Sequence, residues 1–76
     1  METFEIKGEF ITLHNLLKAA DMVASGGMAK AVIQGGEVLV NNTVETRRGK
    51  KLRKGDTVEF ADRQITIATD STDPTV

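Results

Sequence analysis

The sequence predicts an α+β domain in which two short helices pack on a small antiparallel sheet. Three patterns indicate this class: an alternating apolar segment at the start, helical spacing of apolar residues in the next part, and short alternating segments separated by turn residues in the second half. The 76 residues make one small domain with little area for a deep catalytic cleft. We expect a single domain over residues 1–68 and a disordered tail over residues 69–76, which are rich in Asp, Ser and Thr.

The first two predicted elements are a short strand and a helix. Phe4 and Ile6 show the alternation of a half-buried strand, which Gly8 ends. From Thr12, which we take as the N-cap, the period changes to that of a helix. The apolar stripe of this helix consists of Leu13, Leu16, Leu17 and Ala20.

A second helix follows almost at once. Apolar residues at positions 28, 29, 32 and 33 repeat the helical spacing until Gly35 and Gly36 stop it. Lys30 lies on the opposite, polar face of this helix, and Lys18 lies on the polar face of the first one. The Ser-Gly-Gly sequence at 25–27 has two interpretations: a tight turn into the helix, or a place where free amides of the first helical turn receive a phosphate.

The second half of the chain predicts strands joined by tight turns. Val38 to Val40 lead through Asn41-Asn42, a pair that tolerates positive φ, into residues 43–46, so we expect a hairpin. Lys54-Gly55-Asp56 marks a turn before a strand over 57–60, and residues 61–63 return the chain into a strand over 64–67. The predicted core consists of Phe4, Ile6, Leu13, Leu16, Leu17, Val32, Ile33, Leu39, Leu52, Val58, Phe60, Ile65 and Ile67.

Positive charge is concentrated in one segment. Six of the ten lysines and arginines lie between Arg47 and Lys54, whereas the rest of the chain carries four positive charges against eleven carboxylates. Like charges at this density repel one another, so the cluster indicates a polyanionic partner, most simply the phosphates of a nucleic acid. The alternative is a solvated face that keeps an acidic domain in solution. The carboxylates that can pair with Arg53 or Lys54 are Glu45, Asp56 and Glu59.

Composition disfavours several chemistries. The absence of cysteine excludes thiolate zinc sites and cysteine nucleophiles, and the single histidine, His14, has no identifiable nucleophile partner, so an ordinary surface histidine is the default. We therefore expect no enzyme activity, no metal and no cofactor. Neither a signal peptide nor an apolar run of membrane-spanning length is found, so we expect a cytoplasmic protein without a membrane partner.

The aromatic content bears on the kind of nucleic acid. All three phenylalanines fit core or strand positions, which disfavours binding of single strands through exposed stacking platforms. Recognition of structured RNA through shape and backbone needs cations more than rings, and it fits this composition better.

Three segments occur together in a fixed order: ITLHNLLKAADMVASGGMAKAVIQGG, EVLVNNTVETR and RRGKKLRKGDTVEF. From about Ile11 to Phe60 this arrangement resembles the RNA-binding domain, or αL motif, shared by ribosomal small-subunit protein S-four, pseudouridine synthases and tyrosyl-tRNA synthetases. Within the family it is most similar to the small stand-alone bacterial branch of the YaaA and YbcJ type. The resemblance implies a non-catalytic, ribosome-associated module whose helix pair and adjoining loop present basic side chains to structured RNA, such as ribosomal or transfer RNA.

The chain departs from this pattern at the helix starts. Many family members carry an arginine at the start of each helix, where this chain has Thr12-Leu13 and the Ser-Gly-Gly-Met sequence at 25–28. The helix-borne cations are then lysines, and bidentate recognition has to come from arginines of the basic segment. The predicted RNA-binding residues are Lys18, Lys30, Arg47, Arg48, Lys50, Lys51 and Arg53.

We expect a monomer that binds RNA, and two other functions stay open. One is a protein-interaction module whose basic loop docks an acidic partner surface in a ribosome-, RNA-processing- or replication-associated complex. The other is a small enzyme. The sequence shows no recognisable combination of nucleophile, base and orienting group that would support this function.

Overall fold

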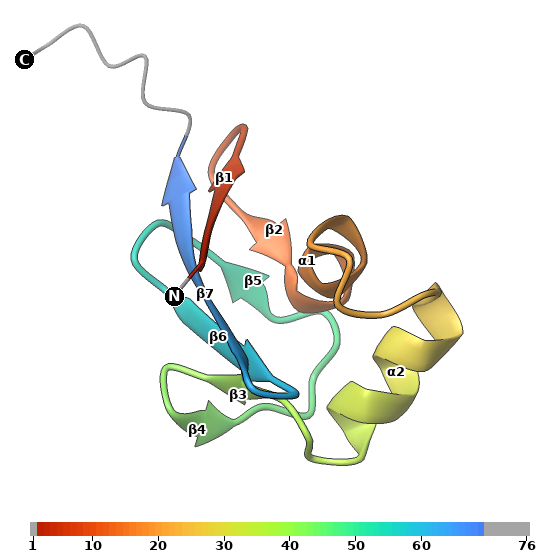
Figure 1. Ribbon diagram of the computed structural model, residues 1–76. Helices are drawn as coiled ribbons and strands as arrows, with labels where there is room; N and C mark the ends of the chain where they lie inside the picture. Colours follow the sequence, from red (N-terminus) through yellow and green to blue (C-terminus); the bar gives the residue numbers. More distant parts are fainter. Residues whose placement is uncertain (1, 70–76) are drawn as a thin grey trace, which may run out of the picture.

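The computed structural model describes residues 2–69, in which a helix pair packs beside strands (Figure 1). In chain order the elements are β1 (Glu2–Ile6), β2 (Ile11–Thr12), α1 (Leu13–Ala19), α2 (Gly26–Gln34), β3 (Leu39–Val40), β4 (Thr43–Val44), β5 (Lys51–Leu52), β6 (Thr57–Phe60) and β7 (Arg63–Thr69). The strands form a five-stranded sheet in the order β1-β7-β6-β3-β4 and a separate two-stranded ribbon of β2 and β5. The predicted α+β class is confirmed.

The main sheet is mixed rather than purely antiparallel. The pairs β7–β6, β6–β3 and β3–β4 are antiparallel as predicted, but β1 runs parallel to β7, with Glu2 opposite Ile65 and Ile6 opposite Thr69. The alternation of apolar and polar residues in β1 predicted a strand but not its partner. A two-residue period shows which side chains share a face, and it does not show which strand lies alongside or in which direction that strand runs. The expectation of an all-antiparallel sheet was therefore wrong for this edge.

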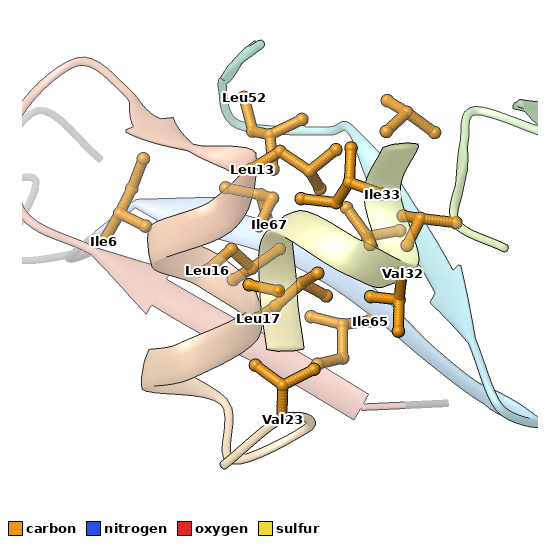
Figure 2. Close-up of a cluster of buried hydrophobic side chains, with 14 residues drawn as sticks. Ile6, Leu13, Leu16, Leu17, Val23, Val32, Ile33, Leu52, Ile65 and Ile67 are labelled. Carbon is orange, nitrogen blue, oxygen red and sulfur yellow. The ribbon is translucent and has the colours of Figure 1, made fainter. Parts of the chain in front are cut away.

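The helices cover the core as their apolar stripes predicted. Leu13, Leu16 and Leu17 of α1 are fully buried, and Ile33 of α2 lies beside them (Figure 2). These side chains meet those of β7, including Ile65, in one cluster of buried residues (Figure 2). Burying a side chain of this size removes about 1.5–3 kcal/mol of unfavourable exposure to water, so the helix pair and the sheet stabilise each other.

The predicted core is largely confirmed, with one exchange in β3. Leu39 is half-buried and lies outside the core cluster, whereas Val38 and Val40 on either side of it are buried. Because successive strand residues point to opposite faces, the sequence allowed two arrangements: Leu39 inward, or Val38 and Val40 inward. Val23, which the sequence prediction left out, is also buried.

Tight turns set the register of the sheet. Asn41 and Asn42 have φ of 53° and 68°, the left-handed conformation that a two-residue hairpin turn requires, so the predicted hairpin is confirmed. The Asn41 side chain also accepts a hydrogen bond from the Thr57 amide at 2.9 Å and donates one to Asp56 at 3.1 Å. The hairpin is thus fixed to the predicted turn before β6, in which Gly55 has a left-handed φ of 93°.

The last strand reaches further than its apolar pattern. β7 ends at Thr69, which pairs with Ile6, so this residue belongs to the sheet rather than to the expected tail. The remaining residues of the expected tail, 70–76, lie outside the described residues.

Candidate nucleic-acid interface

The basic segment is hydrogen-bonded to the start of α1. The amide of Leu13 donates to the carbonyl of Lys50 at 2.9 Å, and the amide of His14 donates to the carbonyl of Arg48 at 3.1 Å. Thr12 occupies the predicted N-cap position, but its side chain makes no capping hydrogen bond. Because the first amides of a helix have no partner inside it, the loop carbonyls take the place of the side-chain cap. The helix and the basic segment are therefore one structural unit.

His14 strengthens this connection. Its Nδ1 lies 2.9 Å from the carbonyl oxygen of Arg48, the same atom that accepts its backbone amide. A carbonyl can only accept, so Nδ1 carries the hydrogen. The expectation of an ordinary surface histidine was wrong: the side chain is half-buried and holds the basic segment in place.

The two helix lysines lie on exposed sides of α1 and α2. Lys18 is one helical turn after His14, so both face the same side of α1. A methyl group added at Gly26 would lie 3.9 Å from Nζ of Lys18, which places this ammonium group at the start of α2. Lys30 is one turn further along α2 and is exposed, as is Lys18. His14 thus contacts the basic segment and Lys18 lies at the start of α2, and that these cations form one continuous surface with Lys30 stays a prediction.

The start of α2 is capped by its own serine. Ser25 accepts a hydrogen bond from the amide of Met28 at 3.2 Å, which is the usual geometry of an N-cap serine. This observation supports the interpretation of the Ser-Gly-Gly sequence as a tight turn into the helix. The phosphate interpretation stays a prediction.

Arg47 is the one predicted site residue that forms an ion pair within the described part of the chain. Its Nε lies 3.0 Å from Oε2 of Glu45, and its Nη2 donates to Oε1 at 3.3 Å. The hydrogen bonds from the Arg47 side chain and amide hold the pKa of the Glu45 carboxyl below its usual value. The guanidinium itself remains largely solvent-exposed. Its charge is thus partly offset by an acid two residues away.

The other cations of the segment form no ion pair within residues 2–69, although the charge of Lys50 is among the causes that lower the pKa of Glu45. Arg48, Lys51 and Arg53 are exposed and Lys50 is half-buried, and none of them forms an ion pair with a described residue. The expectation that Asp56 could pair with the Arg53 side chain was wrong, because the Asp56 carboxylate accepts the Arg53 backbone amide at 2.8 Å instead. These charges are available to an outside anion.

Sequence reasoning missed Phe10. The expectation that all three phenylalanines fill core or strand positions was wrong here, because Phe10 precedes β2 and is 41% exposed. Nζ of Lys51 lies 4.9 Å from the ring centroid, and Cζ of Arg53 lies 6.0 Å from it, within the range of cation–π contacts. The signal was the Phe10-Ile11 pair, since only one of two adjacent strand residues can face inward.

Arg63 lies apart from this surface and has a structural role. Its guanidinium forms an ion pair with Glu2 and donates to the carbonyls of Ala20 at 3.2 Å and Asp21 at 3.4 Å. It therefore joins the end of α1 to the first strand.

Other kinds of site are not found in residues 2–69. The described residues contain no group of His, Cys, Asp or Glu side chains placed to hold a metal ion, and no pocket is present on their surface. No helix among them is long and apolar enough to span a membrane.

Known proteins with similar sequences are small and match most of this chain. It is 54% identical over 55 residues to the Bacillus subtilis (strain 168) protein named "Probable ribosome maturation protein RlbA", which covers 72% of this chain and 78% of that protein. It is 38% identical over 68 residues to the Escherichia coli (strain K12) protein named "Putative RNA-binding protein YbcJ", which covers 88% of this chain and 97% of that protein.

The fold and a family model agree with these relatives. The solution structure of YbcJ from E. coli, described as revealing an αL motif involved in RNA-binding, matches with a TM-score of 0.69 at 38% identity over 90% of this chain and 87% of that chain. A family model described as the S4 domain matches residues 4–68. The resemblance seen in the helix pair, the hairpin and the basic segment is thereby confirmed, and this chain belongs to the S4 domain family.

Proposed function

We propose that this chain is a non-catalytic RNA-binding module that holds structured RNA against one basic surface. The residues assigned to this basic surface are Lys18, Lys30, Arg47, Arg48, Lys50, Lys51 and Arg53. The names of YbcJ and of its solution structure, both of which refer to RNA binding, support the same function for this chain.

The observation that carries the proposal is the attachment of the basic segment to α1. The carbonyls of Arg48 and Lys50 are bound by the first two amides of the helix, so the side chains of these residues project from a fixed backbone. A fixed arrangement of cations loses little conformational freedom on binding. It also matches a ligand whose phosphates are themselves held in a fixed shape, as they are in folded RNA.

The types of cation indicate how the surface would contact RNA. Lys18 and Lys30 on the helices are compact charges that follow a phosphate backbone, whereas Arg48 and Arg53 offer planar guanidinium groups for two-pronged contacts with phosphate. The pairing of Arg47 with Glu45 makes its contribution conditional, since phosphate has to compete with a carboxylate that is already in place.

The name of one relative supports a particular class of RNA. The protein RlbA, which is 54% identical to this chain, is named for ribosome maturation. Ribosomal RNA in a maturing particle is therefore the ligand that we assign to the basic surface, and the cytoplasm is the compartment where such a particle is met.

Alanine replacement tests the proposal directly. A quadruple variant replaces Arg47, Arg48, Lys50 and Lys51 with alanine. It should lose most of the RNA affinity that the wild type shows in a gel-shift titration, because it lacks the central cations of the basic surface. The fold should persist, since only backbone atoms of the segment bond to α1. A matched control is Lys54→Ala, which removes an exposed lysine of the same run from the turn fixed to β7. Unchanged binding by the quadruple variant would refute the proposal.

A ribonuclease treatment separates this function from docking on a protein. Partners captured from a cell extract by the wild-type chain should leave the resin after ribonuclease if RNA connects them. Partners that stay bound after treatment, and are lost with the quadruple variant, would establish the protein-interaction function in place of RNA binding.

A further inference from the structure

The exposed ring of Phe10 is unlike the other aromatic side chains of this protein. Of the three phenylalanines, Phe4 and Phe60 pack against the core cluster, whereas Phe10 is 41% exposed. A single exposed apolar side chain is common on protein surfaces and is not evidence of a site by itself. The groups around the ring make the difference here.

Two cations, Lys51 of β5 and Arg53 directly after this strand, lie over this ring. The Lys51 ammonium is 4.9 Å and the Arg53 guanidinium 6.0 Å from the ring centroid. Leu52 between them is fully buried, so its two neighbours project to the opposite, solvent side of β5. The register pairs Ile11 with Leu52, which places Phe10 beside Arg53 one step further along the ribbon.

The cations of this cluster form no ion pair with a residue in the described range 2–69. The Asp56 carboxylate is occupied by the Arg53 amide and by the Asn41 side chain, not by the Arg53 guanidinium. Glu9, next to Phe10 in the sequence, is exposed and forms no ion pair with a residue in the described range 2–69. An aromatic face and two available cations therefore meet at one place.

We infer that Phe10, Lys51 and Arg53 bind one unpaired nucleotide of the RNA. The base stacks on the ring in place of the two cations that lie over it in the free protein, and these cations move to contact the phosphates on either side of that nucleotide. Inside a double helix both faces of a base are covered by neighbouring bases, so a base away from the duplex ends presents a face to the ring only when it is bulged or looped out. This inference rests on the proposed function and adds the feature of the RNA that the surface selects.

The position of the cluster joins it to the basic surface. Lys51 follows Lys50, whose carbonyl accepts the first amide of α1, and it pairs with Thr12 in the ribbon. An RNA stem lying across the helix pair and the basic segment would thus bring an adjacent unpaired nucleotide to Phe10. In this arrangement the basic surface binds the phosphate backbone of the RNA, and the Phe10 ring adds a preference for RNA with an unpaired base.

Two matched RNAs and two substitutions test the inference. The ligands are a blunt RNA duplex and the same duplex with one extruded adenosine. Phe10→Leu, which keeps the apolar character and removes the aromatic face, should weaken binding of the bulged duplex roughly 5- to 150-fold, the range expected for loss of one stacked base. Its affinity for the fully paired duplex should equal that of the wild type. Phe10→Trp should restore the preference for the bulge, and thermal unfolding of both variants controls for folding.

Nuclear magnetic resonance gives a second, direct readout. The chain has three phenylalanines and no tryptophan or tyrosine, so the ring signals can be assigned one by one. The bulged duplex should move the Phe10 ring protons upfield through the ring current of the stacked base. The signals of Phe4 and Phe60, which pack against the core, should stay in place.

The outcomes separate this inference from the function on which it rests. If Phe10→Leu binds the bulged duplex as tightly as the wild type does, while the quadruple alanine variant loses both RNAs, the nucleotide site is refuted and RNA binding stands. If the wild type binds neither RNA, the proposed function fails and the nucleotide site fails with it.

Discussion

The number of cations without an acidic partner sets how strongly RNA binding should depend on salt. Six residues of the basic surface form no ion pair within residues 2–69, namely Lys18, Lys30, Arg48, Lys50, Lys51 and Arg53. Each phosphate that is neutralised releases counterions and contributes roughly 0.7–0.9 to the slope of log affinity against log salt concentration. If about four to six phosphates are contacted, the slope should be roughly −3 to −5.

The corresponding change in affinity is large enough to measure easily. With all six cations engaged, raising monovalent salt from about 50 to about 200 mM should weaken binding roughly 300- to 2,000-fold. Fluorescence anisotropy of a labelled RNA duplex, titrated at several salt concentrations, measures this slope. Replacing Arg48 with alanine should reduce its magnitude by roughly 0.7–0.9, whereas Lys54→Ala, in the turn fixed to β7, should leave it unchanged.

Arg47 allows a sharper test, because its ion pair predicts an effect of the opposite sign. Replacing Glu45 with Gln removes the carboxylate that holds the guanidinium, so Arg47 becomes free to contact phosphate. Affinity at low salt should rise and the slope should steepen by roughly 0.7–0.9. Adding Arg47→Ala to this variant should cancel both effects. A slope near zero, or a Glu45→Gln slope equal to that of the wild type, would contradict the assignment of these cations to the interface.

Two further predictions concern the fold itself. Leu52 is fully buried between the exposed cations Lys51 and Arg53. Leu52→Ala should therefore lower the free energy of unfolding by about 2–5 kcal/mol in chemical denaturation. A loss below about 1 kcal/mol, close to that of a surface substitution, would show that Leu52 of the ribbon is not part of the stabilising core. The hydrogen bonds from Arg63 and Arg47 lower the pKa of Glu2 and Glu45 below the usual 4.5, so the stabilisation from these pairs should be complete above that pH and disappear as the pH falls through the lowered values. A variant with both acids changed to Gln should therefore be less stable than the wild type at neutral pH and equal to it once the pH lies below both lowered pKa values, as measured by thermal unfolding. A difference that persists in acid would mean that the pairs act through packing instead of charge.

Elements with a strong local pattern could be predicted from the sequence. The apolar spacing of the two helices located them to within a few residues, and the Asn41-Asn42 pair identified the hairpin because few other residues adopt left-handed φ readily. The turn at Gly55 was predicted from the Lys54-Gly55-Asp56 sequence, because Gly and Asp are typical turn residues. In these cases the chemistry of a few neighbouring residues determines the local backbone, and the pattern is sufficient.

Features that depend on contacts distant in sequence could not be predicted. The capping of α1 by the carbonyls of Lys50 and Arg48 has no local signature, since any residue can supply a carbonyl. The sequence pattern suggested Thr12 for that task, and this preference is overridden once a loop lies against the helix start. The exposure of Phe10 likewise depends on Leu52 of the partner strand, which fills the inward side of the ribbon.

The parallel pairing of β1 with β7 determines when this domain can fold during its synthesis. β1, the first strand among the described residues, pairs with β7, the last of them, and Ile65 and Ile67 of β7 complete the buried cluster beneath the helices. A nascent chain that still lacks these residues already contains the leucines of α1, but it has no complete sheet against which they can be buried. Folding to the native core therefore needs β7 as well as the helices, and a nascent chain in which β7 has not left the exit tunnel keeps these leucines exposed to water.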